Sequence, residues 1–250
     1  MTLPFGVWDV GQSFNEAVDL EEEENEQYEE EIKTIKITIA PKTRLSCSLF
    51  IISFGTAATT FIDMYVNLPE KSTAEVQIIR GTVKTRETCF LYQIDNTVLC
   101  QCKVKVAPED SFDWIKEVMA CVLFDQAIIL TSYPKYSLKS NFKNTSEDVL
   151  RYLKTSYSKF ATNVQMLEKD NLIHGLPAAI LSYCEFHCID ALMYVTYGES
   201  HFVDVFSLKA FEPVLQDNGM KSLPRFTTFE MTKKFKLFDG IGVADKNLYI

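Results

Sequence analysis

No segment constrains the fold of this chain more than residues 171–184, which read NLIHGLPAAILSYC. Gly175 closes a loop, and Pro177 follows where the first turn of a helix tolerates a missing backbone N–H. Apolar residues then continue to Phe186. The small residues that allow close packing in this stretch are Ala178, Ala179 and Ser182. The sequence therefore predicts a closely packed helix over residues 176–186 that carries no catalytic group.

Strands and helices alternate along the first half of the chain. Residues 35–39 alternate isoleucine with polar side chains, which predicts a half-buried strand. Residues 48–53 form an apolar run of strand length, Gly55 follows, and residues 56–66 are typical of a helix. A strand, a tight turn and a helix in this order begin an α/β unit.

Further strands and helices are predicted along the rest of the chain. We expect strands at 75–81, 88–94, 97–106, 127–130 and 191–197, with a hairpin turn at Asp95 and Asn96. We expect a helix after Pro108, a polar loop at 135–147, and helical segments near 146–155, 207–216 and 227–238. The fold class is therefore α/β, a single-domain layered sandwich over residues 32–238 with a central mixed β-sheet flanked by helices.

The acidity of the chain is confined to its first residues. Residues 1–31 hold eleven acids and no lysine or arginine, so a net charge of −9 becomes +2 for residues 32–250. Such a segment cannot bury enough apolar surface to fold. We expect residues 1–31 to form a disordered, solubilising arm; the alternative is a contact with a basic partner surface.

Composition excludes several classes of protein. An acidic arm without a compensating basic stripe argues against nucleic acid as a partner. The longest apolar runs, such as residues 49–52, are far too short to span a membrane, and the first ten residues show no secretory signal. Seven irregularly spaced cysteines then indicate reduced cytosolic thiols. We expect a cytoplasmic protein, with the nucleus as a second compartment.

Motifs of catalysis are absent from the sequence. It contains no phosphate-binding glycine loop, no Gly-x-Ser-x-Gly elbow and no His-Glu-x-x-His zinc helix. Cys184, His187 and Cys188 have spacings that would place them on one helix face, where they could share a metal. No fourth ligand is evident, and cysteine in an apolar helix commonly packs as a small hydrophobe. We therefore expect no metal site at these residues.

Two other positions invite a chemical interpretation. Cys100 and Cys102 lie two apart on a predicted strand and so point to the same face, which favours core packing over a disulfide. Residues 53–56 end a strand, where α/β enzymes place ligands. Because no partnering acid or base is identifiable, turn architecture is the favoured interpretation.

Several segments of the chain resemble the proteasome assembly chaperone family. The most specific is 171–184; residues 97–110, running on to Val118, and 203–215 continue the match, and 47–66 fits more loosely. The resemblance spans most of residues 35–216, and an acidic N-terminal arm is also familiar in this family. Residues 135–147 and 217–240 are not distinctive.

The resemblance implies an α/β sandwich with no catalytic activity and no cofactor. It also implies a heterodimer with a homologous second subunit, proteasome assembly chaperone 2. Such heterodimers bind proteasome α-type subunits, promote assembly of the α-ring of the core particle and discourage off-pathway association of α-rings.

The last three residues match the ending of the family pattern, a hydrophobic residue, a tyrosine and any residue. Here these are Leu248, Tyr249 and Ile250. Such an ending offers an apolar wedge, a ring with a hydroxyl, and a carboxylate for a lysine or backbone N–H groups. We expect residues 239–250 to be a flexible tail that docks in a pocket between α-ring subunits. Without the resemblance, a frayed terminus would be the better interpretation.

Two other functions are compatible with the sequence. One is an α/β enzyme of phosphorylase- or hydrolase-like architecture, which requires a clustered acid–base pair in a deep pocket. The other is a general protein-interaction module with no link to the proteasome. Co-purification separates them, since α-type subunits accompany the chain only if it is a proteasome assembly chaperone.

Overall fold

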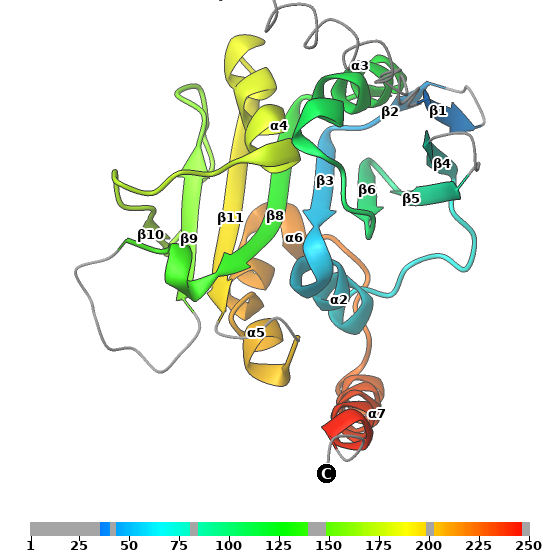
Figure 1. The fold of residues 1–250 in the computed structure, drawn as a ribbon, viewed down its shortest axis with the longest axis vertical. Coiled ribbons are helices and arrows are strands. Elements are labelled where there is room, and N and C mark those ends of the chain that lie inside the picture. Colours follow the sequence, from blue (N-terminus) through cyan, green and yellow to red (C-terminus); the bar gives the residue numbers. More distant parts are fainter. Residues whose placement is uncertain (1–35, 41–43, 81–84, 140–148, 199–202, 247–250) are drawn as a thin grey trace, which may run out of the picture. The chain divides into compact units, whose positions relative to one another are not determined.

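Strand β3 (Leu49–Phe54) is buried along its whole length in the middle of the sheet (Figure 1). Phe50 and Ile52 belong to one apolar cluster, and Leu49 and Ile51 belong to another. Successive side chains of a strand point to opposite faces, so both faces of the sheet are covered here. A strand covered on both faces needs a continuous apolar run. That is the physical reason for the apolar residues 48–53.

The computed structural model describes residues 36–40, 44–80, 85–139, 149–198 and 203–246, which all lie in one unit of the chain. Within them the main sheet has nine strands in the order β1-β4-β5-β6-β3-β8-β11-β9-β10. The other strand bounds are Lys36–Ala40 (β1), Ala74–Arg80 (β4), Thr85–Ile94 (β5), Thr97–Cys102 (β6), Gln126–Pro134 (β8), Val149–Lys154 (β9), Gln165–Met166 (β10) and Asp190–Gly198 (β11). A small second sheet pairs β2 (Leu45–Ser46) with β7 (Val122–Leu123).

The main sheet is mixed, as predicted. Strand β3 runs parallel to β6 and β8, and β8 runs parallel to β11. Strands β1, β4, β5 and β6 pair antiparallel in sequence, and β9 pairs antiparallel with β11. The parallel centre therefore needs crossover connections, which the helices supply.

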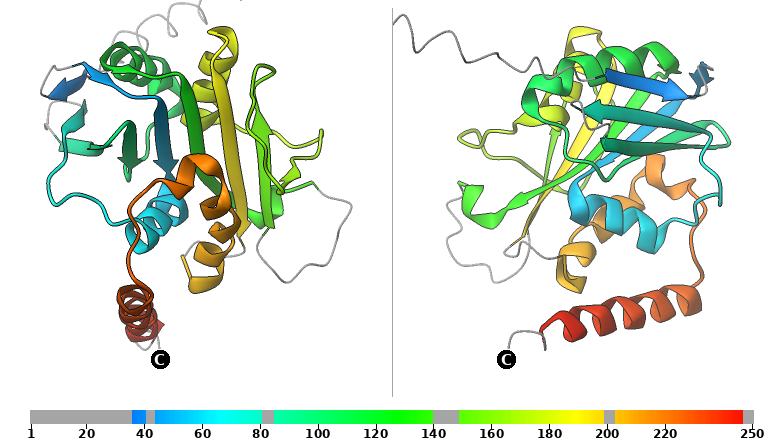
Figure 2. Two further views of the ribbon diagram at one scale, coloured as in Figure 1. Left: turned by 180° about the vertical axis from the view of Figure 1, so that it is seen from behind. Right: turned by 45° about the vertical axis from the view of Figure 1, so that its right-hand side comes forward.

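Helices cover both faces of the sheet, which confirms the predicted layers (Figure 2). On one face lie α3 (Ser111–Cys121), preceded by the 3₁₀ helix η2 (Pro108–Asp110), and α4 (Gly175–Phe186). The other face carries α2 (Gly55–Tyr65), α5 (Val205–Lys209), the 3₁₀ helix η4 (Glu212–Gln216), α6 (Asn218–Lys221) and α7 (Thr228–Lys246). A further 3₁₀ helix, η3 (Lys135–Ser137), follows β8.

Two tight turns behave as the sequence predicts. The hairpin between β5 and β6 places Asp95 at φ +50°, a left-handed conformation that aspartate adopts more readily than most residues. Gly55 takes φ +76° between β3 and α2, and a Cβ there would lie 3.4 Å from Ser132 Oγ. Glycine thus allows the strand to pass directly into the helix.

Three predicted elements need correction. The helix predicted near 146–155 is wrong over its described part, because residues 149–154 form β9. Val149 and Leu153 pack toward one apolar cluster, and Leu150 and Tyr152 pack toward the other, so no polar alternation marks this strand.

The helix predicted at 207–216 is broken, since Pro213 cannot continue the backbone hydrogen-bond ladder of α5. Strand β6 ends at Cys102, short of the predicted residue 106.

Helix α7 begins at a capping box. Thr227 N donates to Glu230 Oε2 at 2.8 Å, and Glu230 N donates to Thr227 Oγ1 at 3.3 Å. The helix then continues to Lys246, so the flexible tail predicted at 239–250 is wrong over its described part, residues 239–246. Adding residues to a formed helix is easy in the absence of proline. No helix in the described ranges is both long and apolar enough to cross a membrane. The acidic arm 1–31, most of the polar loop 135–147, and residues 247–250 lie outside the described residues.

Candidate functional site

Helix α7 contacts the rest of the fold through a narrow stripe of side chains. The stripe consists of half-buried residues spaced three and four apart, which places them on one helix face: Met231, Lys234, Phe235 and Phe238. The apolar members pack against the cluster beneath α2, and the ring centroids of Phe235 and Tyr65 are 5.7 Å apart. Phe229 and Leu237, outside the stripe, are exposed. One face therefore holds this helix.

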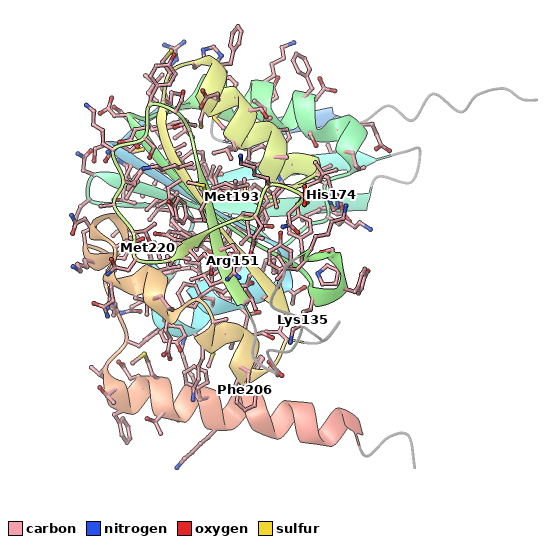
Figure 3. All side chains as sticks on the ribbon, turned by 90° about the vertical axis from the view of Figure 1, so that its left-hand side faces the viewer. Lys135, Arg151, His174, Met193, Phe206 and Met220 are labelled. Atoms are coloured by element: carbon pink, nitrogen blue, oxygen red, sulfur yellow. The ribbon has the colours of Figure 1, made fainter. Side chains whose placement is uncertain are left out.

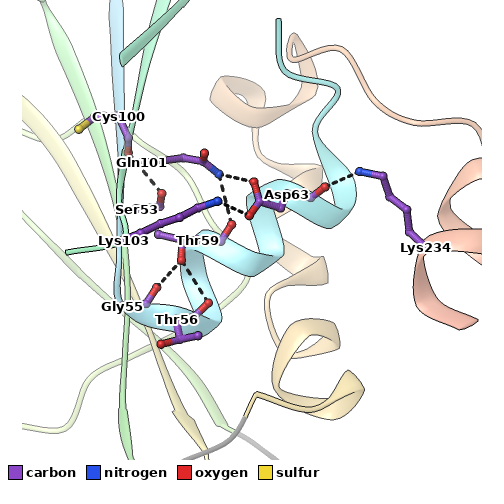
Figure 4. Close-up of polar contacts among 9 residues, drawn as sticks. All are labelled: Ser53, Gly55, Thr56, Thr59, Asp63, Cys100, Gln101, Lys103 and Lys234. Atoms are coloured by element: carbon purple, nitrogen blue, oxygen red, sulfur yellow. Dashed lines mark hydrogen bonds and ion pairs between the residues drawn. The ribbon is translucent and has the colours of Figure 1, made fainter. Parts of the chain in front are cut away.

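Asp63, in the last turn of α2, connects this helix to the sheet and to α7 (Figure 4). Its Oδ1 accepts a hydrogen bond from Gln101 Nε2 of β6 at 2.8 Å. Its Oδ2 pairs with Lys103 Nζ at 2.7 Å. Its backbone carbonyl accepts from Lys234 Nζ of α7 at 2.8 Å. A single residue thus ties three elements together.

Electrostatics explain why lysines gather at this place. The last carbonyls of a helix lack partners within it and carry partial negative charge, so an acid there is unfavourable. Helix α2 has no basic residue in its own last turn, and Lys103 and Lys234 supply the positive charge from other elements. The ammonium of Lys234 also lies 3.5 Å from the ring centroid of Phe226. Burial lowers the pKa of Lys234, an effect that Asp63 and Glu230 oppose.

The predicted docking residues Leu248, Tyr249 and Ile250 lie outside the described residues, so their role stays a prediction. The structure does show how the preceding helix, α7, is attached to the rest of the fold. Lys234 and Asp63 are 171 positions apart in sequence, and no local pattern connects them. In the sequence, only the three-and-four spacing of the apolar residues in α7 indicates which face of this helix packs against the rest of the fold.

At the strand end, residues 53–56, the hydroxyl of Ser53 and the carbonyl of Gly55 form hydrogen bonds within the fold. Ser53 is buried and its Oγ donates to the Cys100 carbonyl at 3.3 Å. Thr59 Oγ1 donates to the Gly55 carbonyl at 2.8 Å and so closes the first turn of α2. These bonds support the interpretation of the segment as turn architecture.

Two adjacent grooves lie elsewhere on the described surface. One has a volume of about 650 Å³ and lies between residues 161–165 and 213–218. The other, about 380 Å³, is lined by the amino-terminal ends of three parallel strands, at Leu49, Thr97 and Gln126. Open α/β enzymes bind ligands at the carboxyl ends of such strands. The second groove is therefore at the opposite end of the sheet from the place that an enzyme of this class would use.

The arrangement predicted for Cys184, His187 and Cys188 on one helix face is wrong. Helix α4 ends at Phe186, and Cys188 follows in a left-handed conformation with φ +55°. Cys184 is buried, which raises its pKa to about 12, whereas Cys188 is exposed. Within the described ranges no three histidine, cysteine or acidic side chains come together as metal ligands.

Cys100 and Cys102 share one face of β6, as predicted, and both are buried in the core. Cys102 Sγ also lies 2.9 Å from Cys89 Sγ on the neighbouring strand β5, a contact that no sequence pattern indicated. All seven cysteines are free thiols. Burial raises the pKa of Cys100, and the contact with Cys89 together with burial raises that of Cys102.

Comparison with known proteins gives consistent results. A family model named PAC1 and described as "Proteasome assembly chaperone 4" matches residues 10–250. Proteasome assembly chaperone 1 of Mus musculus is 31% identical over 222 residues, which cover 81% of this chain and 76% of the mouse protein. The Homo sapiens protein of the same name is 30% identical over 195 residues, covering 71% and 68%.

Solved structures share the fold at low sequence identity. Pyrococcus furiosus PbaB, described as an archaeal proteasome activator, gives a TM-score of 0.54 at 11% identity and covers 86% of this chain and 100% of its own. Pyrococcus furiosus PbaA, described as an archaeal homolog of proteasome-assembly chaperone, gives a TM-score of 0.55 at 10% identity, covering 86% and 92%. Because the family model spans nearly the whole chain and the fold agrees, this chain belongs to the proteasome assembly chaperone family.

Proposed function

We propose that this chain is a non-catalytic subunit of a proteasome assembly chaperone. It pairs with proteasome assembly chaperone 2, binds α-type subunits in the cytoplasm and nucleus, promotes α-ring assembly and prevents off-pathway association. The observation that carries the proposal is the family match over residues 10–250, which includes both the sandwich and α7. The hydrogen bonds of Ser53 and Gly55 within the fold support turn architecture, and not a catalytic site, at this strand end.

In this proposal Leu248, Tyr249 and Ile250 plug a pocket between two neighbouring α-ring subunits. Burying Leu248 and Tyr249 contributes about 1.5–3 kcal/mol each, and a charge-assisted bond to the carboxylate of Ile250 contributes about 1.5–3 kcal/mol. Ordering each flexible residue costs about 1–2 kcal/mol, and association itself costs more. An isolated tail peptide should therefore bind weakly.

The attachment of α7 to the fold increases the effective concentration of a weakly binding tail at its pocket. Helical residues 239–246 rise about 1.5 Å each, or about 12 Å together. Residues 247–250 add at most about 14 Å, so the tripeptide stays within about 26 Å of residue 238, instead of the ~40 Å that an extended segment 239–250 would allow. A shorter tether raises the effective concentration at a pocket that the docked body already faces.

The test is a pull-down of assembled α-rings by the heterodimer with and without residues 248–250. We expect the truncation to weaken capture at least tenfold while the unfolding transition of the chain stays unchanged. A second variant carries additional glycines after Ile250, which keeps the side chains but moves the carboxylate, and it should lose most of the same affinity. Tyr249→Phe keeps the ring and removes only the hydroxyl, so it should lose less affinity than the two altered tails.

The outcomes separate the parts of the proposal. Unchanged capture by the truncated chain would show that the tail does not dock. Failure of the intact chain to capture any α-type subunit would reject the chaperone function itself. Strong capture by the intact chain and weak capture by both altered tails is the expected result.

A further inference from the structure

Helix α7 carries exposed apolar side chains on the face that points away from the fold. Phe229 is 80% exposed and Leu237 is 61% exposed. Among the exposed large apolar side chains of the described residues, they are the only two that share one helix or strand. Single exposed apolar side chains are normal on a protein surface, whereas several on one face indicate a contact surface.

Two lysines lie on the same face as these apolar residues. Each residue turns a helix by about 100°, so Phe229, Lys233, Lys236 and Leu237 fall within an arc of about 100°. This outer face of α7 lies opposite the half-buried stripe that packs on the fold. Figure 3 shows α7 along the outside of the molecule, with side chains directed both toward the fold and away from it. A surface helix normally has one apolar face, whereas α7 has apolar residues on two.

The charge of the outer face is positive. Residues 229–238 contain one acid, Glu230, and three lysines. Glu230 is engaged in the capping box at the start of the helix, and Lys234 is bonded to α2. Lys233 and Lys236 are exposed, and neither forms an ion pair with another described residue. A partner for this face must therefore supply carboxylates around an apolar spot.

We propose that the outer face of α7 docks on an acidic surface of one of the two α-type subunits that form the pocket for the tail. The inference rests on the proposed function, since it takes the docked tail as its starting point. Phe229 and Leu237 pack on an apolar spot of that subunit, and the two lysines pair with carboxylates at its rim. Lysine stems can lie along apolar surface while their ammonium groups stay at the edge, so the four side chains form one continuous contact.

The length of chain between the outer face and the tail identifies this partner. Residues 238–246 are helical and rise about 1.5 Å each. Residues 247–250 add at most about 14 Å, so Ile250 lies within about 28 Å of Leu237. This reach is about the diameter of a small domain. A subunit that holds the tail is therefore also within reach of the outer face.

The test compares two matched double variants in the capture of assembled α-rings by the heterodimer. Phe229→Ser with Lys233→Glu alters the outer face of α7. Phe112→Ser with Lys116→Glu makes the same changes on α3, where an exposed phenylalanine and an exposed lysine have the same spacing on the other face of the sheet. We expect the α7 variant to weaken capture by roughly fivefold or more and the α3 variant to leave it unchanged.

The charge contribution is tested separately. Lys233→Glu with Lys236→Glu should weaken capture and also make it less sensitive to salt, because salt screens the pairing of exposed lysines with carboxylates. Neither lysine contacts the rest of the described fold, so amide exchange of α7 should stay unchanged in this variant. Unchanged exchange excludes a loosened helix as the cause of weaker capture.

A photo-crosslinking phenylalanine, benzoylphenylalanine, in place of Phe229 identifies the partner directly. We expect it to crosslink an α-type subunit in the captured complex. A crosslink to the second chaperone subunit or to another part of this chain would overturn the inference, as would unchanged capture by the α7 variants. These results leave the proposed function intact, because the unaltered chain still captures α-rings. If the unaltered chain captures no α-type subunit, both the proposed function and this inference are rejected.

Discussion

Helices α4 and α7 show two ways of attaching a helix to the same sandwich. Helix α4 has 12 residues and buries Leu176, Ile180 and Cys184 in the core. Helix α7 has 19 residues, yet none of its described side chains is fully buried. A half-buried stripe and the bond from Lys234 to Asp63 hold it instead. The first helix is part of the core, whereas we expect that the second can be displaced without unfolding the sheet.

The largest expected effect is in α4. Ile180→Ala should lower the free energy of unfolding by about 2–5 kcal/mol, because the side chain is fully buried and its removal leaves a cavity. Denaturant unfolding measures this change. Phe186→Ala in the same helix is the control: its side chain is 84% exposed, so the change should stay within about 0.5 kcal/mol. Similar losses in both variants would contradict the assignment of α4 to the core.

Phe235→Ala should have a smaller and local effect. The side chain is half-buried against Tyr65, so about 1 kcal/mol of contact with α2 is lost. Amide hydrogen exchange of residues 228–238 should accelerate about fivefold, while exchange in the central strands β3 and β8 stays unchanged. If the strands lost protection equally, α7 would unfold together with the core and the comparison with α4 would fail.

Lys234→Met should loosen α7 to a lesser extent. Methionine keeps most of the apolar stem but loses the hydrogen bond to the Asp63 carbonyl and the contact with the Phe226 ring. Because the lysine is only partly buried, we expect a loss below about 1 kcal/mol, measured as faster amide exchange in α7. Lys233→Met, at an exposed position on the same helix, should leave exchange unchanged. Equal amide exchange of α7 in the two variants would show that Lys234 does not help to hold this helix.

The smallest expected effect is a pH dependence at the start of α7. Hydrogen bonds from Thr227 lower the pKa of Glu230 below its usual 4.5. Its stabilising contribution is therefore present above pH 4.5 and disappears as pH falls through the lower pKa of the folded state. The Thr227 amide signal should shift with this titration in NMR spectra, and Glu230→Gln should show no such step. A titration at or above pH 4.5 would rule out the capping box as the cause.

Local patterns predicted much of the fold but only part of the site. Strand β3 and helices α2 and α4 were predictable because their signals are local. These signals are the apolar run 48–53, the glycine turn at Gly55 and the apolar pattern over 176–186. Strand β9 was not, because both of its faces meet apolar neighbours and its pattern does not differ from that of a helix.

The sequence by itself determined the α/β layering, the hairpin at Asp95 and the resemblance to the family. Only the tertiary structure decided that Asp63 meets Lys234, and that Phe229 and Leu237 stay exposed on the outer face of α7. Hydrophobic periodicity and turn residues depend only on neighbours along the chain, so they can be recognised in the sequence directly. The partner of a charged side chain depends on which distant elements pack together, and that is fixed only when the apolar faces of the sheet are covered.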